Sequence, residues 1–381
     1  MRILFLVYHG FSPHSGISKK IHYQVKGLKE NGHDVRLCYY DFSSNGHSCR
    51  YIDGVVIKDY GIGKLAGLRQ RIDYGSIYDY CIREKIAFVY ARSFHNATPW
   101  LINLFRKLHQ AGVCSVTEIP TYPYDTEYSP HWWRQPLYFI VDKWFRRCLY
   151  QYMDAIITFS DDKEIFGQRT ICISNGVDFD SIQLHEPILL DNNCAIHLIG
   201  VAEVKPWHGF DRLVEGLGKY YQHSDNPRQV FFHIVGGIWS GHMIGERGFQ
   251  TLIEKYNLQE KVILHGQLFG QELDDVFKMC QFAVGSLGRH RCGITYIKTL
   301  KNREYATRGI PFIYSEQDSD FDAQPYVLKA QADESPINIQ QIVDFLEHFT
   351  MQPKDIRKTV EHLSWKIQMQ KVIDEMNEDI S

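Results

Sequence analysis

The 381-residue sequence lacks the cysteine patterns that mark disulfide-stapled and zinc-binding proteins. Its nine cysteines are scattered along the chain, odd in number and without a CxxC pair, which argues against both classes. Several cysteines fall in expected strands, where they would act as small buried hydrophobic residues. A reducing compartment is therefore expected.

Long apolar runs and an excess of one charge are also missing. No segment approaches the roughly 20 apolar residues that span a bilayer, and the run from Ile3 to Tyr8 is too short for the apolar core of a signal peptide. The formal net charge is only −3, whereas proteins that bind a phosphate backbone concentrate Lys and Arg in one domain. We expect a cytosolic protein with no general affinity for nucleic acid.

Strand and helix patterns alternate along the chain and restart once. In the first half, a helix with Ile17, Ile21, Val25 and Leu28 at helical spacing joins two strands, and an Asp53-Gly54 turn marks a β-hairpin. The strands expected in the two halves are 3–7, 35–39, 86–91 and 113–117, then 195–201, 230–235, 262–265, 282–285 and 311–314. Such alternation predicts an α/β protein with two parallel-sheet domains, because roughly 150 residues are typical of one domain. Ligands of such sheets bind at the carboxyl ends of the strands.

Two loops that follow expected strands carry residues that could hold a phosphate. The loop from Gly10 to Gly16 leads into a helix N-terminus, which favours an anion, although a turn without a ligand fits equally well. This loop lacks the GxGxxG spacing of an NAD site. Lys205 and His208 follow the strand expected at 195–201, where either could neutralise a phosphate or simply be solvated.

Gly236 and Gly237 end the strand expected at 230–235. Their missing side chains would allow a ligand to approach the backbone closely. A Gly-Gly pair is by itself a weak indication of a ligand.

Two DxD patterns, Asp178-Phe-Asp180 and Asp318-Ser-Asp320, raise the question of a metal site. Carboxylates at this spacing can hold Mg²⁺ or Mn²⁺ through nucleotide phosphates. Both patterns lie in expected loops, where short Asp-rich stretches commonly form turns, so we predict no metal at either.

The segment from Thr295 to Arg308 combines a helical period with an unusual charge. If it is one helix, Ile297, Leu300 and Glu304 share a stripe, and Glu304 lies on the inward side. A buried carboxylate needs hydroxyl or cationic partners, and ligand hydroxyls are one possibility. An ordinary surface pair with Arg308 or Lys301 is the alternative.

The segment from Arg134 to Tyr152 mixes basic and aromatic residues, including Trp144, Arg146 and Arg147. A helix of this composition can lie on an anionic membrane surface. A packed helix with a solvated basic side is the alternative, and the sequence favours it.

Several stretches follow the pattern of one enzyme family. They are the N-terminal strand with its glycine loop, Gly32–Val35, Ser174–Asp178, Trp207–Arg212, Leu300–Ala306 and Gly309–Pro311. Over nearly its whole length the chain resembles the retaining GT-B glycosyltransferases of family four, which include bacterial capsule and lipopolysaccharide transferases. The resemblance implies two Rossmann-like, doubly wound parallel-sheet domains facing a cleft, with an acceptor domain at 1–184, a donor domain at 185–360 and a terminal helix at 361–381 that packs on the first.

The resemblance also implies roles for individual residues. In that family two glutamates eight positions apart contact the donor, the first near the sugar and the second near the ribose; Glu304 matches the second, and Tyr296 stands at the first. Further donor contacts are implied at Gly16, Lys205, His208, Gly236, Gly237, Lys298, Leu300 and Lys301. His95 and Glu118 are implied on loops of the first domain, near the donor sugar and the acceptor. No metal is implied, since a donor phosphate oxygen can take the acceptor proton.

Three functions fit the sequence. The leading one is a hexosyltransferase that moves a sugar from a nucleotide-diphosphate sugar to a glycan or lipid-linked acceptor in bacterial surface polysaccharide synthesis. The others are a nucleotide-sugar epimerase, which would need a base, and a non-catalytic GT-B subunit, which Tyr296 would suit. The expected location is the cytoplasm, with peripheral contact at the inner face of the plasma membrane as a further hypothesis.

Overall fold

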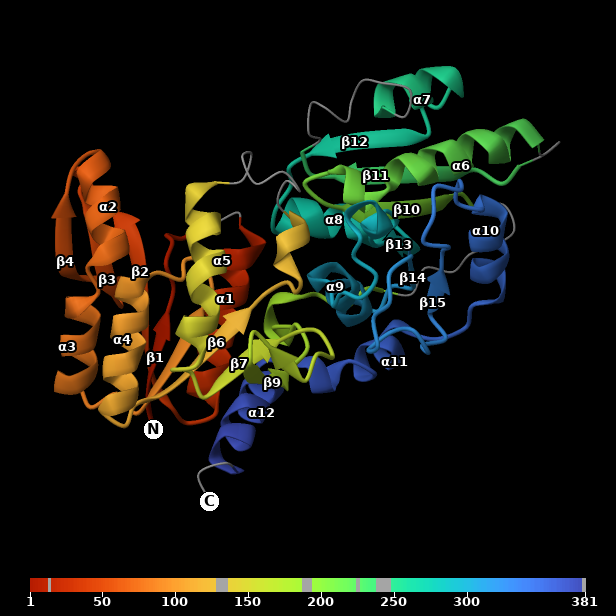
Figure 1. Ribbon diagram of the computed structural model, residues 1–381. Coiled ribbons are helices and arrows are strands. Elements are labelled where there is room, and N and C mark those ends of the chain that lie inside the picture. Colours follow the sequence, from red (N-terminus) through yellow and green to blue (C-terminus); the bar gives the residue numbers. More distant parts are fainter. Residues whose placement is uncertain (13–14, 128–135, 187–193, 224–226, 238–247, 379–381) are drawn as a thin grey trace. The chain divides into compact units, whose positions relative to one another are not determined.

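The computed structural model describes residues 1–12, 15–127, 136–186, 194–223, 227–237 and 248–378 (Figure 1). The chain divides into two compact units: the first is Met1–Gly176 with Ser364–Ser381, and the second is Val177–Leu363. Each unit is built on a sheet of largely parallel strands covered by helices, so the predicted α/β class is confirmed. The first unit ends at Gly176 rather than at the predicted residue 184.

The sheet of the first unit has nine strands within the described residues, in the order β4-β3-β2-β1-β5-β6-β7-β9-β8. The pairs from β2 to β9 are parallel, whereas the β2–β3, β3–β4 and β8–β9 pairs are antiparallel. The predicted hairpin turn is present, with Asp53 and Gly54 both at positive φ. The bounds are β1 (Arg2–Leu6), β2 (Asp34–Phe42), β3 (Ser48–Ile52), β4 (Val55–Gly61), β5 (Phe88–Arg92), β6 (Cys114–Ile119), β7 (Ala155–Thr158), β8 (Glu164–Ile165) and β9 (Gln168–Cys172).

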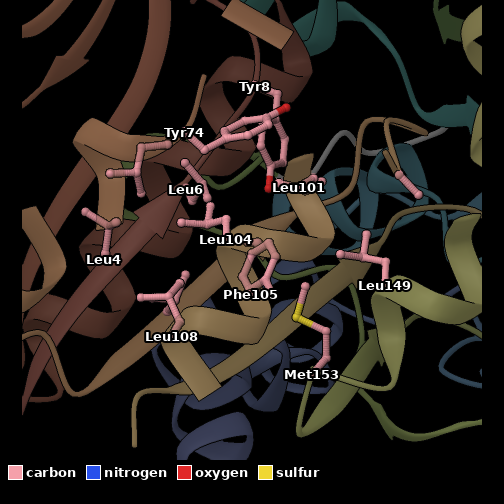
Figure 2. Close-up of a cluster of buried hydrophobic side chains, with 14 of the residues drawn as sticks. Leu4, Leu6, Tyr8, Tyr74, Leu101, Leu104, Phe105, Leu108, Leu149 and Met153 are labelled. Carbon is pink, nitrogen blue, oxygen red and sulfur yellow. The ribbon is translucent and has the colours of Figure 1, made fainter. Parts of the chain in front are cut away.

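Apolar residues on both sides of β1 explain why helices cover both faces of this sheet. Ile3 and Phe5 belong to a core with α1 and α12, whereas Leu4 and Leu6 point into the other core, with Leu104 and Phe105 of α4 (Figure 2). Such two-sided burial is typical of parallel strands. The helix bounds are α1 (Gly16–Glu30), α2 (Lys64–Ile72), α3 (Gly75–Arg83), α4 (Pro99–Gln110), α5 (Leu137–Tyr150) and α12 (Trp365–Glu378).

The sheet of the second unit is parallel throughout the part that the structure describes, in the order β12-β11-β10-β13-β14-β15. Helices α6, α7 and α10 pack on one face, and α8, α9 and α11 pack on the other. The bounds are β10 (Ile196–Val201), α6 (Phe210–His223), β11 (Val230–Val235), α7 (Phe249–Lys255), β12 (Val262–Gly266), α8 (Gln271–Met279), β13 (Phe282–Val284), α9 (Leu300–Arg308), β14 (Phe312–Tyr314), β15 (Val327–Lys329), α10 (Ile339–His348) and α11 (Pro353–Lys358).

Short 3-10 helices complete the described elements, namely η1 (Tyr124–Glu127), η3 (Phe179–Ser181), η4 (Pro206–His208), η6 (Arg289–Cys292) and η7 (Glu361–Leu363). None of the helices in the described ranges is long and apolar enough to cross a membrane.

A buried cluster of charges in the first unit surrounds Glu118. The resemblance places Glu118 on a loop, but it lies within β6 and is fully buried. Its carboxylate lies 3.0 Å from Nζ of Lys20 and bonds to Arg92, while Tyr90 Oη donates to it at 2.8 Å and Gln24 Nε2 at 2.5 Å. Burial alone would raise the pKa of Glu118, but the charges of Lys20 and Arg92 and the two hydrogen bonds outweigh it and lower the pKa to about 2.

Three histidines form a row across the sheet of the second unit. Nδ1 of His197 lies 2.8 Å from Nε2 of His233, and Nδ1 of His233 lies 2.8 Å from Nε2 of His265. Burial, followed by the charges of His197 and His265, lowers the pKa of His233 to about 4. His233 is therefore neutral in the folded protein near neutral pH.

Replacing Glu118 by Gln should destabilise the first unit, because Lys20 and Arg92 would stay buried without an anion. The expected loss is about 3–5 kcal/mol in the free energy of unfolding, measured by urea denaturation. Glu164→Gln, an exposed carboxylate of β8 in the same unit, is the matched control and should change little. Unchanged stability in Glu118→Gln would contradict this structural role, and lost activity at unchanged stability would favour contact with an acceptor.

Acidification should weaken the fold through His233. The pKa of His233 is about 4 in the folded protein and about 6.5 in the unfolded chain, so the unfolded chain binds the proton first as pH falls. The stability that neutral His233 gives the fold is therefore complete above pH 6.5 and is lost as pH falls towards 4. The expected size is roughly 1–3 kcal/mol. Urea denaturation at pH 7.5 and pH 5.0 should therefore show a smaller difference in His233→Gln than in the wild type or in the exposed control His348→Gln. If the loss of stability between pH 7.5 and pH 5.0 is equal in all three proteins, His233 is not the source of the acid sensitivity.

Candidate functional site

Three loops of the second unit meet at the carboxyl ends of β10, β13 and β14. The loop after β13 bonds to the loop after β10, where the Leu287 N–H donates to the carbonyl of His208 at 2.8 Å and Arg291 donates to the carbonyl of Pro206 at 2.7 Å. It also bonds to the loop after β14, where the Ser315 N–H donates to the carbonyl of Ser286 at 3.0 Å. Parallel pairing brings these loops to one edge, which is where the sequence predicts a ligand.

Helix α9 contributes its N-terminus to this edge and begins later than predicted. It starts at Leu300, and the hydroxyl of Thr299 caps it by accepting from the Asn302 N–H. The preceding residues are extended instead of helical, since Thr295 and Ile297 exchange backbone hydrogen bonds with Gln317 at 2.7 and 3.0 Å. The prediction of a helix from Thr295 is therefore wrong.

Glu304 lies on the outer side of α9, which corrects the predicted inward position. Its side chain is 33% exposed and Leu300 is 37% exposed, whereas Arg303 and Ala306 are fully buried. The predicted stripe fails because Ile297 precedes the helix. The Glu304 carboxylate accepts hydrogen bonds from Arg308 at 2.9 and 3.0 Å, which is the surface pair considered as the alternative.

The buried side of α9 is held by a compensated cluster of charges. Arg303 is fully buried and donates to Asp318 at 2.6 and 3.0 Å, and it also bonds to Asp320. Nζ of Lys298 lies 3.7 Å from Asp320, so the ammonium already has a carboxylate neighbour. The second DxD pattern therefore neutralises an arginine, and the described residues contain no group of three or more acidic, His or Cys side chains placed to hold a metal ion.

Lys205 and His208 take different places in the loop after β10. His208 is buried, and its Nδ1 accepts the backbone N–H of Lys205 at 3.0 Å, so this ring braces the loop. The Lys205 side chain is 34% exposed, with Nζ 3.6 Å from Glu203 and 5.4 Å from the ring of Trp207. Of the two, Lys205 remains the cation that a ligand could reach.

Gly236 and Gly237 differ in what their missing side chains allow. A Cβ on Gly236, which has φ of 130°, would lie 1.8 Å from the carbonyl oxygen of Ala202. This glycine is therefore required for packing against the loop after β10, whereas close approach by a ligand stays a prediction. A Cβ on Gly237 would meet nothing nearer than 3.6 Å.

Lys301 and Glu316 have buried charged atoms at this edge that lack a hydrogen-bond partner within the described residues. They are the ammonium of Lys301 in the first turn of α9 and both carboxylate oxygens of Glu316, which follows β14. Burial lowers the pKa of Lys301, and the charge of Arg289 lowers it further. Burial raises the pKa of Glu316, against its own backbone N–H and the opposing charges of Arg289, Lys301 and Lys329. Lys301 is among the predicted donor contacts, whereas Glu316 was missed, although its place directly after an expected strand could have indicated it.

Tyr296 lies beside this edge. It forms an isolated parallel bridge with Gln317, and its hydroxyl lies 2.8 Å from Oγ of Ser319. The structure thus brings Tyr296, Lys205, His208, Lys301 and Leu300 to elements around one edge of one sheet.

The remaining predicted residues belong to the first unit. Gly16 begins α1, and nothing lies within 4 Å of where its Cβ would be. His95 lies in the loop after β5 at φ of 50°, and its ring stacks on Tyr124 at 4.0 Å between centroids. Burial lowers the pKa of His95 to about 4, which keeps it neutral. Glu118, in contrast, is enclosed in its ion cluster.

The sequence has no match among protein-family models or curated proteins. The fold does have matches among solved structures. Sucrose-phosphate synthase from Thermosynechococcus elongatus matches with a TM-score of 0.67 at 14% identity, over 100% of this chain and 99% of that one. HepE from Anabaena in complex with UDP gives 0.63 at 13% identity, over 100% and 99%. UDP-GlcNAc 2-epimerase from Neisseria meningitidis bound to UDP-GlcNAc gives 0.51 at 11% identity, over 99% and 100%.

At such identities these similarities concern the fold. The chain has the GT-B fold, with two Rossmann-like α/β domains in tandem, as its sequence predicts.

Proposed function

We propose that the chain is a glycosyltransferase that binds a nucleoside-diphosphate sugar at the carboxyl edge of the sheet in its second unit. The observation that carries this proposal is the ammonium of Lys301, which is buried beside the loops after β10, β13 and β14 and has no hydrogen-bond partner among the described residues. The charges of Arg289 and Lys301 both act on the carboxylate of Glu316. Lys329 is engaged elsewhere, because it pairs with Asp322 at 2.7 Å. A diphosphate oxygen would accept a hydrogen bond from the Lys301 ammonium.

The similar structures support this donor class. HepE was solved with UDP, and the epimerase was solved with UDP-GlcNAc. Lys205 is partly exposed on the loop after β10 and would add a second cation for the phosphates. The N-terminus of α9 would add the positive end of a helix dipole.

We further propose a retaining transfer of a hexosyl group that needs no metal. Cations and helix N-termini would stabilise the leaving diphosphate, and a donor phosphate oxygen would take the proton of the acceptor. The proposed acceptor is a glycan or lipid-linked saccharide in bacterial surface polysaccharide synthesis. His95, neutral and half-buried on a loop of the first unit, is the proposed contact with the donor sugar.

Glu304 is the proposed acceptor of the ribose hydroxyls, and it would exchange its bond to Arg308 for them. Glu304→Gln should lower donor affinity by about 1–3 kcal/mol, because it removes a charged hydrogen-bond acceptor at constant volume. Arg308→Gln is the matched control, since it removes the partner but keeps the carboxylate. Calorimetric titration with UDP-glucose, ADP-glucose and GDP-mannose in EDTA measures the donor affinity of both variants. Equal affinity of Glu304→Gln and the wild type would show that Glu304 is a structural residue.

The same sugar nucleotides distinguish the three candidate functions. Transfer to an acceptor, or slow donor hydrolysis, indicates a glycosyltransferase. Release of an epimerised sugar nucleotide without acceptor indicates an epimerase, and binding without turnover indicates a non-catalytic subunit. Binding that requires Mn²⁺ would contradict the metal-free site.

We also propose peripheral contact with an anionic membrane through α5 and α2. Trp144 is 75% exposed on α5 and Arg147 is exposed, whereas Arg146 is engaged with Asp125 at 2.7 Å. The guanidinium of Arg71 lies over the ring of Tyr138 at 5.9 Å, which joins the end of α2 to the start of α5. Arg134 lies outside the described residues.

Helix α2 adds apolar and basic residues to this surface. Leu65 and Leu68 are 66% and 55% exposed on a helix that also carries Lys64, Arg69 and Arg71. Exposed apolar residues beside cations are typical of helices that bind an anionic membrane surface.

The wild-type protein should sediment with vesicles that contain phosphatidylserine at low salt, and Trp144→Ala should sediment less. Ile367→Ala is the control, because it removes an exposed apolar residue of α12, on the opposite face of the same sheet. No sedimentation of the wild type, or an equal effect of both variants, would exclude this surface.

A further inference from the structure

Glu316 is a buried carboxylate that accepts no hydrogen bond from another described residue at either oxygen. Its side chain is 2% exposed, and it directly follows Ser315, the residue after β14. Burying such a group without partners costs stability, so its presence at a ligand edge indicates a partner that binds there. The nearby Asp318 shows the contrast, because it is equally buried but fully occupied by Arg303.

The groups that face Glu316 come from three elements. Arg289 follows β13, Lys301 lies on α9, and Lys329 ends β15. Lys329 binds the backbone carbonyl of Glu316 and the side chain of Asp322, so it does not serve the carboxylate. Lys301 influences the carboxylate through its charge, yet within the described residues no hydrogen bond or ion pair connects the two groups.

A second unpartnered group lies next to this pair. The hydroxyl of Ser286 is buried without a hydrogen-bond partner among the described residues, and the Ser315 N–H donates to the carbonyl of the same serine. On the other side, Gln317 forms a bridge with Tyr296: the Gln317 N–H donates to the carbonyl of Thr295, and the Ile297 N–H donates to the carbonyl of Gln317. Unused donors and acceptors thus occur together between the loops after β13 and β14 and the start of α9.

We propose that the Glu316 carboxylate accepts a hydrogen bond from one hydroxyl group of the donor sugar, beside the Lys301 ammonium that the diphosphate would engage; this inference rests on the proposed function. A hydroxyl can donate to a carboxylate, which a phosphate oxygen cannot do at neutral pH. A sugar hydroxyl therefore suits Glu316, whereas the diphosphate suits Lys301.

The proposal predicts opposite effects on sugar binding and on stability. Glu316→Gln should lower the affinity for a sugar nucleotide about 10- to 100-fold, because a charged hydrogen-bond acceptor is lost. Affinity for the matching nucleoside diphosphate should stay within about twofold, since that part of the ligand does not reach Glu316. The melting temperature should not fall, because the wild type buries this carboxylate without a partner.

Calorimetric titration tests this with three pairs, UDP and UDP-glucose, ADP and ADP-glucose, and GDP and GDP-mannose. Lys301→Met is the second variant and should weaken binding of both members of each pair, because the diphosphate is common to both. Glu272→Gln, an exposed carboxylate on α8 of the same unit, is the matched control and should bind like the wild type. Melting curves of all variants show whether each one folds.

The outcomes separate this inference from the proposed function. If the wild type binds no member of the panel, the proposed function fails and the inference fails with it. If the wild type binds a pair and Glu316→Gln binds both members as the wild type does, only the inference fails. If Glu316→Gln has a lower melting temperature and loses the same affinity for both members of the pair, Glu316 is a structural residue. If the wild type binds both members with equal affinity, a sugar subsite is excluded.

Discussion

Parallel pairing of β10, β13 and β14 is the constraint on which the candidate site depends. Because these strands run in one direction, the loops that follow them meet at one edge and bond to one another through Leu287, Arg291 and Ser315. The loop after the neighbouring strand β11 packs on the loop after β10, because a Cβ on Gly236 would lie 1.8 Å from the carbonyl oxygen of Ala202. Helix α9 then supplies its N-terminus to that edge.

The buried charged groups are of two kinds, which differ in whether groups of opposite charge bond to them. Glu118 in the first unit and Arg303 in the second are surrounded by opposite charges, so they hold elements together. The Lys301 ammonium and the Glu316 carboxylate are buried as well, yet their charged atoms have no hydrogen-bond partner within the described part of the chain. An unsatisfied group costs the fold free energy, and a ligand that satisfies it recovers that cost on binding. These two groups are therefore the basis of the proposed ligand site.

The first strand and the β-hairpin could be predicted from the apolar run Ile3–Val7 and the turn residues Asp53-Gly54, because these patterns depend only on neighbouring residues. The side on which Glu304 lies was mispredicted, because the helical period was extended through Thr295 and Ile297, which pair with Gln317 instead. The partners of Glu118 could not be predicted, since Gln24 and Arg92 are 94 and 26 residues away in the sequence.

The central claim is that the second unit holds a nucleoside diphosphate at the sheet edge where the Lys301 ammonium has no hydrogen-bond partner among the described residues. Thermal unfolding with UDP, ADP and GDP, each compared with its nucleoside, tests it most directly. A ligand at about 100 times its dissociation constant stabilises the folded state by about 2.7 kcal/mol. The account predicts that at least one diphosphate raises the melting temperature in a saturable way, that its nucleoside does so less, and that Lys301→Met reduces the effect. An unchanged melting temperature with all three diphosphates would contradict it.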